Sequence, residues 1–259
     1  MPELPDIELF RITAKKALHK DIRDISLRDA DRLLEVSPDT LRKKLKGKQF
    51  TLTKREGKYL FIKLNTGDYL GLHFGMTGSL RYLPAKDENP DYSKLSILLD
   101  EDHTLHLISK RKLGKILIAD DPDEFKKVEK IGKDAGDMER DEFIEIMNNK
   151  RGYVKSTLMN QSVISGIGNI YSDEVLFQAR IDPRRRVEKL SDDERKTLYR
   201  KMKHVIKLAI EKHANPSEFP ASWLLSHREE GASCPGCDGK VKKAKLSGRG
   251  YYYCPDCQQ

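Results

Sequence analysis

The spacing of the four cysteines restricts the fold of this chain more than any other feature of its sequence. They lie within the last 26 of 259 residues as two Cys-x-x-Cys pairs, with sixteen residues between the pairs: Cys234, Cys237, Cys254 and Cys257. Two such pairs supply four thiolates for a closed, tetrahedral, structural Zn²⁺ site. Cysteines confined to one end do not make the disulfide framework of a secreted fold. We therefore predict one structural Zn²⁺ in a C-terminal zinc ribbon.

The residues between the cysteine pairs are basic and include Gly248-Arg249-Gly250. Two glycines allow a turn that brings an arginine and backbone amides close to a phosphate. The alternative is an ordinary hairpin tip between ribbon strands. The whole chain has a net charge of +8, from 49 Lys and Arg against 41 Asp and Glu. This excess favours an anionic partner such as nucleic acid, although a basic solvated surface alone also produces it.

The sequence does not carry the features of a membrane or secreted protein. No apolar run approaches the ~18 residues of a membrane span. Acidic residues stand near the N-terminus, where a signal peptide has a basic region. We expect a soluble, cytoplasmic, nucleoid-associated monomer that has no membrane partner.

Hydrophobic periodicity divides the chain into two parts. A first helix is expected over about residues 5–19, and alternating or short apolar runs then predict strands at QFTLTKR, KYLFIKL, DYLGLHF, SKLSILLD, TLHLISK and GKILIAD. Short strands with regular turns suggest a β-sandwich or barrel. Residues 120–137 are charged and contain a proline and two glycines, so we expect a linker there.

From Met138 onward the pattern becomes helical. The run ERDEFIEIMNNK predicts one helix, and a capping box at residues 191–194 begins another that runs to about Lys212. The expected fold class is therefore α+β. It comprises an N-terminal β-sandwich with a leading helix (1–119), a linker (120–137), a helical domain (138–225) and the zinc ribbon (226–259).

The opening residues MPELPDIE allow two interpretations. Pro5 and Asp6 suit the first turn of a helix. That interpretation does not explain Pro2 and Glu3. Removal of Met1 exposes a secondary amine at Pro2, with a carboxyl group beside it. An α-amino group titrates near ~8, so part of it is unprotonated at neutral pH and can form a Schiff base with a sugar carbonyl.

A second glycine-bearing turn lies between two predicted helices. Residues 155–159 are helical in pattern, and another helix is predicted from Asn169 to Ala179. The intervening Gly166-Ile167-Gly168 leaves free backbone N–H groups at a helix N-terminus, which is an anion site. In a basic protein we expect a DNA phosphate there. A plain helical hairpin is the alternative.

Together these motifs resemble the DNA glycosylase family that contains formamidopyrimidine-DNA glycosylase and endonuclease VIII. The resemblance covers nearly the full length, and five phrases carry it in the family's order: PELP, GKYL, HFGMTG, GIGNIYSDE and SGRGYYYCPDCQ. It implies a β-sandwich, a helix–two-turn–helix domain and a zinc ribbon, with DNA in the cleft between the two domains. The implied activity is excision of oxidised bases followed by β- and δ-elimination at the abasic site. The implied partner is double-stranded DNA with a damaged base or abasic site.

The resemblance implies catalytic roles for four residues. The Pro2 amine attacks C1′ of the damaged nucleoside and forms the Schiff base, and Glu3 is the general acid/base near the sugar. Lys58 assists proton transfer and phosphate contact. Arg249 grips phosphate and is linked to the later elimination step.

The resemblance also implies a set of DNA-binding residues: His73, Met76, Tyr92, Arg111, Lys150, Lys155 and Asn169. His73 and Asn169 contact phosphates around the flipped nucleotide. Met76 and Arg111 belong to a wedge that fills the gap left by the flipped base, whose extrusion costs a few kcal/mol.

Several positions depart from the branch of the family that acts on oxidised purines. Asp6 replaces a glutamate. Leu113 stands where phenylalanine is usual in the wedge, and Tyr92 stands about where that branch has a histidine. Residues 213–233 lack the tyrosine- and glycine-bearing loop that caps oxidised guanine. Formamidopyrimidines and 8-oxoguanine remain the first expectation, because the PELP and GMTGSL phrases are closer to that branch.

Two other functions stay open at this point. One is an endonuclease VIII-like glycosylase for oxidised pyrimidines. The other is a zinc-ribbon protein that binds nucleic acid without catalysis. Pro2 and Glu3 distinguish enzyme from binder, because a binder does not need a terminal imine-forming amine beside a carboxylate.

Overall fold

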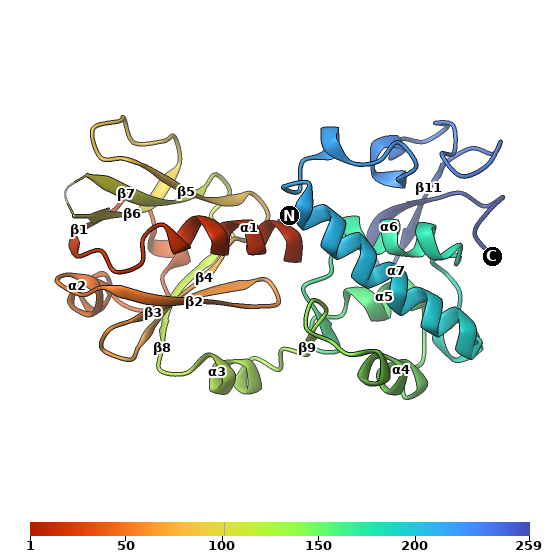
Figure 1. The fold of residues 1–259 in the computed structure, drawn as a ribbon, viewed down its shortest axis with the longest axis horizontal. Helices are drawn as coiled ribbons and strands as arrows, with labels where there is room; N and C mark the ends of the chain where they lie inside the picture. The colour runs from red at the N-terminus through yellow and green to blue at the C-terminus, as the bar shows by residue number, and fades with distance from the viewer. Residues whose placement is uncertain (101) are drawn as a thin grey trace. The chain divides into compact units, whose positions relative to one another are not determined.

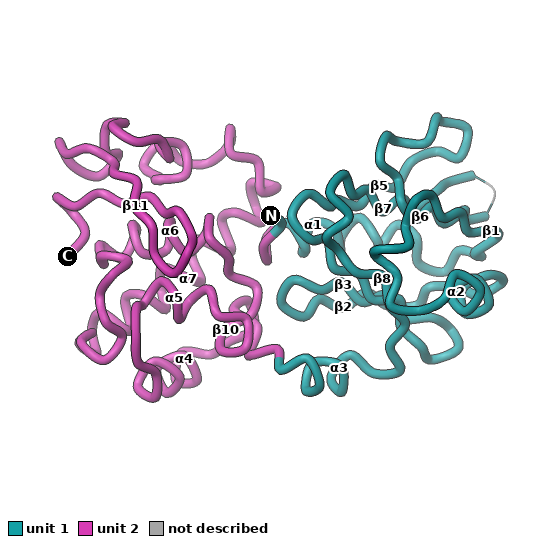
Figure 2. The backbone as a smooth tube through the Cα atoms, turned by 180° about the vertical axis from the view of Figure 1, so that it is seen from behind, with its two compact units in different colours: residues 1–2, 6–130 teal, residues 3–5, 131–259 magenta. Residues whose placement is uncertain are grey.

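The computed structural model describes residues 1–100 and 102–259, which form two compact units (Figure 2). Unit 1 contains residues 1–2 and 6–130, and unit 2 contains residues 3–5 and 131–259. The boundary crosses the first helix, α1 (Leu4–Lys15), whose first two residues belong to unit 2. The N-terminal residues therefore contribute to both units.

Unit 1 is built from two four-stranded antiparallel sheets (Figure 1). One sheet has the order β1-β6-β7-β5 and the other β2-β3-β4-β8. The strands are β1 (Ile22–Leu27), β2 (Phe50–Glu56), β3 (Tyr59–Leu64), β4 (Tyr69–His73), β5 (Gly78–Pro84), β6 (Ser93–Leu99), β7 (His103–Ser109) and β8 (Lys115–Ala119). The helices are α1, η1 (Asp31–Leu33), α2 (Pro38–Leu45) and α3 (Pro122–Val128).

A single apolar core joins the two sheets of unit 1. Ile97 of β6, Leu70 of β4 and Ile7 of α1 belong to the same buried cluster. The tight turn between β3 and β4 uses Gly67 at φ 103°, a conformation that favours glycine. The sandwich expected from the alternating apolar pattern is therefore confirmed.

Some segments differ from expectation. The first helix ends at Lys15 rather than near His19, because the N–H of His19 bonds to the carbonyl of Phe50 (2.7 Å) and the chain turns toward the sheet at φ 62°. The segment expected as a linker, residues 120–137, contains α3 and the short strand β9 (Lys133–Asp134). Asp121 caps α3 by accepting the N–H of Asp123 at 2.7 Å.

Unit 2 is mainly helical. Its helices are α4 (Arg140–Asn148), α5 (Val154–Met159), α6 (Asn169–Ala179), η2 (Val187–Lys189), α7 (Asp192–Glu211), η3 (Pro216–Glu218) and η4 (Leu224–His227). Its strands are β9, β10 (Ile164–Ser165), β11 (Lys242–Leu246) and β12 (Arg249–Tyr253). The parallel pair β9/β10 and the antiparallel hairpin β11/β12 are separate sheets.

Helix α7 organises the core of unit 2. The predicted capping box is present, with Ser191 accepting from Glu194 N (3.2 Å) and Glu194 accepting from Ser191 N (2.7 Å). Its buried residues Leu198, Met202 and Val205 pack in one cluster with residues of α4 and α6. Among the residues that the structure describes, no helix combines the length and apolar character of a membrane span.

Candidate functional site

The N-terminus of α6 holds the carboxylate of Glu3. Oε2 accepts the backbone N–H of Gly168 (2.7 Å) and of Tyr171 (3.2 Å), and Oε1 accepts that of Ile170 (2.8 Å). Glu3 is only 1% exposed. The first N–H groups of a helix have no partner within the helix and lie at its positive end, so they bind an anion well. In this structure the anion at that position is the chain's own Glu3.

The two glycines of Gly166-Ile167-Gly168 serve different purposes. Gly166 has φ 100° and its N–H bonds to the side chain of Gln161 (3.1 Å), while its carbonyl accepts the N–H of Leu4 (2.9 Å). Gly168 has an extended conformation, and a Cβ there would overlap the Glu3 carboxyl group. The absence of a side chain at Gly168 therefore makes room for Glu3.

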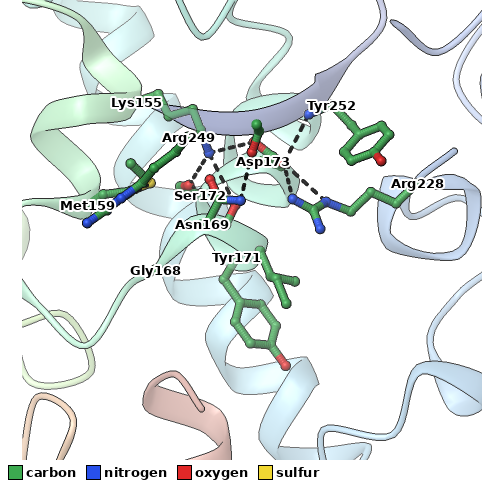
Figure 3. A network of polar contacts seen from close by, with 12 residues as sticks. Lys155, Met159, Gly168, Asn169, Tyr171, Ser172, Asp173, Arg228, Arg249 and Tyr252 are labelled. Atoms are coloured by element: carbon green, nitrogen blue, oxygen red, sulfur yellow. Dashed lines mark hydrogen bonds and ion pairs between the residues drawn. The ribbon is translucent and has the colours of Figure 1, made fainter. Parts of the chain in front are cut away.

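A buried polar network lies behind this helix start (Figure 3). The Nζ of Lys155 donates to Asp173 Oδ1 (2.6 Å), Ser172 Oγ (2.7 Å) and the carbonyl of Asn169 (3.1 Å). Lys155 and Asp173 are both 0% exposed. Burial lowers the pKa of Lys155, and the neighbouring Asp173 acts in the opposite direction. All three Nζ hydrogens therefore have partners within the protein, and the expected contact of Lys155 with DNA stays a prediction.

Asp173 also connects α6 to the ribbon. Its Oδ2 accepts from Arg228 Nη2 (2.7 Å) and Nε (3.1 Å) and from the backbone N–H of Tyr252 (3.1 Å), as Figure 3 shows. The Arg228 guanidinium lies over the Tyr252 ring, 4.8 Å from its centroid. Asp173 and Arg228 were not among the predicted site residues, because the sequence around a single charged residue does not show whether it is buried or what it contacts.

Arg249 begins strand β12 and is exposed. Its Nη1 lies 3.9 Å from the sulfur of Met159, and Asn169 Nδ2 donates to the carbonyl of the next residue, Gly250 (2.8 Å). A pocket of about 390 Å³ adjoins it, lined by Ser156, Met159, Asn160, Gln161, Ser247 and Arg249. The turn before Arg249 has Ser247 at φ 50° and Gly248 at φ 77°. Of the two glycines beside Arg249, only Gly248 is required by its backbone conformation.

The four cysteines form one cluster. Their sulfurs all lie within 4.8 Å of one another, with Cys234–Cys257 at 3.7 Å and Cys237–Cys254 at 3.5 Å. A tetrahedral site with Zn–S bonds of ~2.3 Å requires sulfur–sulfur distances of about 3.8 Å. The N–H groups of Gly236 and Gly239 point at the sulfurs of Cys234 (3.3 Å) and Cys237 (3.4 Å). Four sulfurs at these distances fit a tetrahedral metal ion.

In unit 1, His73 ends strand β4. Burial, with Lys58 and Lys115 nearby, lowers its pKa to about 4. The backbone N–H of Gly75 lies 3.4 Å from Nδ1, so the neutral ring carries its proton on Nε2. His73 is therefore an uncharged N–H donor at neutral pH. Lys58 lies in the turn between β2 and β3 and is 7% exposed.

Met76 and Arg111 come from two neighbouring loops, β4–β5 and β7–β8. The backbone N–H of Arg111 donates to Thr77 Oγ1 (3.3 Å), and a Cβ on Gly75 would overlap the backbone of Leu113. Met76 is 44% exposed and Leu113 is 51% exposed. These loops thus present two apolar side chains to the solvent at one place.

The remaining predicted residues lie on the surface or at the chain start. Tyr92 is 51% exposed with φ 60°, and Lys110 Nζ lies 5.5 Å from its ring centroid. Lys150 follows α4 and is partly exposed. Pro2 is partly exposed and directly precedes Glu3 in the chain. Met1, before it, is 45% exposed.

Comparison with known proteins gives two domain matches. The family described as the formamidopyrimidine-DNA glycosylase N-terminal domain matches residues 1–116. The family described as the formamidopyrimidine-DNA glycosylase H2TH domain matches residues 131–220. A formamidopyrimidine-DNA glycosylase of Laribacter hongkongensis is 30% identical over 274 residues, covering all of both chains.

Solved structures of related proteins have the same fold. The Lactococcus lactis Fpg (MutM) in complex with DNA that contains FAPY-dG has a TM-score of 0.89 and 25% identity, covering 99% of this chain and 100% of that one. A MutM in complex with DNA that contains carbocyclic 8-oxo-G has a TM-score of 0.89 and 25% identity, with full coverage of both chains.

Proposed function

This chain belongs to the formamidopyrimidine-DNA glycosylase family, and on that premise we propose that it excises oxidised purines from DNA and nicks the abasic site by β,δ-elimination. The substrate is double-stranded DNA with a formamidopyrimidine, an 8-oxoguanine or an abasic site. The DNA in the related FAPY-dG and 8-oxo-G complexes supports this substrate class. A basic chain with this substrate is expected at the nucleoid.

The observation that carries the proposal is the arrangement of Glu3. Three backbone N–H groups fix its carboxylate at the start of α6. Pro2 is its covalent neighbour, so a fixed Glu3 also restricts where the Pro2 nitrogen lies. A fixed amine beside a fixed carboxylate is what covalent catalysis at a sugar carbon requires.

The proposed reaction begins at C1′ of the damaged nucleoside. Once Met1 has been removed, the free Pro2 amine bonds to C1′ as the bond from C1′ to the base breaks, and the base leaves with a proton. Opening of the bond from C1′ to the ring oxygen gives the imine, with Glu3 moving protons beside the sugar and Lys58 assisting. Two eliminations then expel the 3′ and 5′ phosphates, and water releases Pro2.

Phosphate contacts are proposed for His73, Asn169 and Arg249. His73 is a neutral donor through Nε2, because its pKa is about 4. Asn169 lies at the N-terminus of α6, and Arg249 lines the pocket beside α5. Tyr92 and Lys150 are proposed as further DNA contacts. For Lys155, whose Nζ is buried, we propose that it supports Asn169 rather than binding DNA.

The four cysteines are proposed to hold one structural Zn²⁺. Bound there, the ion would cross-link the ends of the ribbon and would take no part in bond breaking. The proposed wedge contains Met76 and Arg111, with Leu113 exposed beside them. An apolar wedge offsets part of the free energy lost when a base leaves the stack.

Excision assays on defined duplexes test this function. We expect product from 8-oxoguanine opposite cytosine, and little from dihydrouracil opposite guanine. Glu3→Gln is expected to abolish excision while duplex binding survives. Asp39→Asn, which changes an acid that is 97% exposed in α2, is the control and is expected to excise normally. A preference for dihydrouracil would instead assign the oxidised-pyrimidine branch, and full turnover by Glu3→Gln would refute the role of Glu3.

A further inference from the structure

We propose that Asp173 is a positioning residue that sets the register of β12 on α6 and so places the Arg249 side chain for phosphate contact. This inference rests on the proposed function, because it acts through Arg249. Asp173 itself lies beneath the surface and touches neither Pro2 nor Glu3 in the contacts of the described residues.

The first observation is that the Asp173 carboxylate has a full set of partners from three different segments. Lys155 of α5 donates to Oδ1 (2.6 Å). Arg228, which follows η4, and Tyr252 of β12 donate to Oδ2 (2.7–3.1 Å). A buried carboxylate that accepts several charge-assisted bonds holds its partners in one geometry. Asp173 therefore fixes α5, the segment after η4 and β12 relative to one another.

The second observation is that α6 and β12 are joined at two matched points. Asn169 Nδ2 donates to the carbonyl of Gly250 (2.8 Å), and Asp173 accepts from the N–H of Tyr252 (3.1 Å). The helix positions are four residues apart, which is a rise of about 6 Å. The strand positions are two residues apart, which is about 6.6 Å. Helix and strand thus run side by side in a fixed register.

This register determines where Arg249 lies. Arg249 immediately precedes Gly250, so its place along α6 is set by the same two contacts. A slip of β12 by one residue would turn every side chain of the strand to its other face. It would also separate Arg249 from Asn169 at the helix N-terminus. Ser247, in the turn before β12, also contacts Ser156 of α5 (3.3 Å), but that contact lies in the turn and not along the strand. Among the described residues, the contact at Asp173 is the second hydrogen bond between α6 and β12 themselves, so its loss leaves the strand bonded to the helix at Asn169 alone.

The hairpin has a separate attachment at the cysteine cluster. Cys254 and Cys257 follow β12, and Cys234 and Cys237 precede β11. The cluster packs against Phe177, near the C-terminal end of α6, whereas Gly250, next to Arg249, bonds to Asn169, the first residue of that helix. A metal there would therefore hold the ribbon at the end away from Arg249. Loss of Asp173 should therefore misplace Arg249 while the ribbon keeps its metal.

A double-mutant cycle on the full-length, metal-loaded protein tests the proposal. Asp173→Asn, Arg249→Ala and the double variant are compared for single-turnover incision of a duplex with a preformed abasic site, which makes the result independent of lesion preference. Metal content is measured for each. We expect Asp173→Asn to slow incision by up to about a hundredfold, the loss that a misplaced group can cause. The double variant should be no slower than Arg249→Ala, and metal content should stay at one ion per chain.

Two further variants keep the test decisive. Glu174→Gln changes the adjacent buried acid, which contacts Leu225 N (2.9 Å) and Gln178 (2.9 Å) rather than β12, and its effect should multiply with that of Arg249→Ala. Arg228→Lys removes the paired contact to Asp173 but leaves Lys155 in place. If Asp173→Asn fails to fold or to hold metal, Arg228→Lys takes its place in the cycle.

The outcomes separate the inference from the proposed function. If the incision loss of Asp173→Asn, or of Arg228→Lys in its place, multiplies with that of Arg249→Ala in the double variant, the positioning role is wrong. An Arg249→Ala variant with wild-type incision overturns it as well. A wild-type protein that incises no abasic duplex would instead refute the proposed function itself.

Discussion

Glu3 and Gly168 lie 165 positions apart in the sequence, and the Glu3 carboxyl group occupies the space where any other residue at position 168 would have its Cβ. A Cβ at Gly168 would overlap the Glu3 carboxyl group, which is buried and is held in place by three backbone N–H groups. We therefore expect Gly168→Ala to expel Glu3 from the helix N-terminus and to lower the free energy of unfolding by about 1–3 kcal/mol. Excision should fall as far as it does in Glu3→Gln.

Single-turnover excision and denaturant unfolding of Gly168→Ala measure both effects. Wild-type excision with unchanged stability would show that Glu3 does not need this space.

Glu174 is a second residue for which burial determines the chemistry. It is 0% exposed, and burial raises its pKa from 4.5 to about 7. Between these values the folded state holds a proton that the unfolded state has released. Its contribution to stability is therefore present at low pH and falls as pH rises from about 4.5 to about 7.

Glu174→Gln should remove this dependence. The difference in free energy of unfolding, variant minus wild type, should therefore increase between pH 4.5 and pH 8. The increase should be at most about 3 kcal/mol. Urea unfolding at the two pH values measures the difference. Parallel pH curves for the two proteins would show that Glu174 is ionised to the same extent folded and unfolded.

Among the elements, the β11/β12 hairpin depends on the cysteine cluster as well as on its contacts with α6. Cys237→Ser removes one of four sulfurs, so we expect weaker metal binding, a looser hairpin and incision reduced toward that of Arg249→Ala. Asp238→Asn, the exposed neighbour, is the matched control and should retain both metal and activity. Metal analysis and incision assays check this, and unchanged incision after metal removal would contradict it.

The strands that the sequence analysis found and missed differ in a physical way. The six predicted strands correspond to β2, β3, β4, β6, β7 and β8. The two strands of unit 1 that were missed, β1 and β5, are the two edges of one sheet. Both strands carry charges, Arg23 and Asp24 in β1 and Arg81 in β5, which interrupt the apolar alternation. The edges of the other sheet, β2 and β8, were predicted, so an edge position alone does not hide a strand. Helix α6 was easier, because glycines precede it and Pro183 follows it in the sequence, and the structure ends it at Ala179 as predicted.

The candidate site was predictable where residue type alone determines chemistry. Four cysteines with metal spacing form the cluster. Lys155 was different, because its sequence context does not reveal that Asp173 and Ser172 take up its hydrogens. Asp173 and Arg228 act through partners distant in sequence, and spacing within one segment carries no signal for such contacts.

At the scale of the whole molecule, the N-terminal residues are divided between two units. Pro2 belongs to unit 1, whereas Glu3 belongs to unit 2 and is held by α6. The PELP and GIGN phrases were recognised separately in the sequence. Their contact explains why the first four residues of the chain matter to a helix that begins at Asn169.

The proposed role of Pro2 as the nucleophile is tested by borohydride trapping. Borohydride reduces an imine to a stable protein–DNA bond. With an abasic duplex, and with 8-oxoguanine opposite cytosine, we expect a trapped band from wild type that disappears in Pro2→Gly, while duplex binding persists. Absence of a trapped band from wild type that still binds the duplex, or equal trapping by Pro2→Gly, would contradict it.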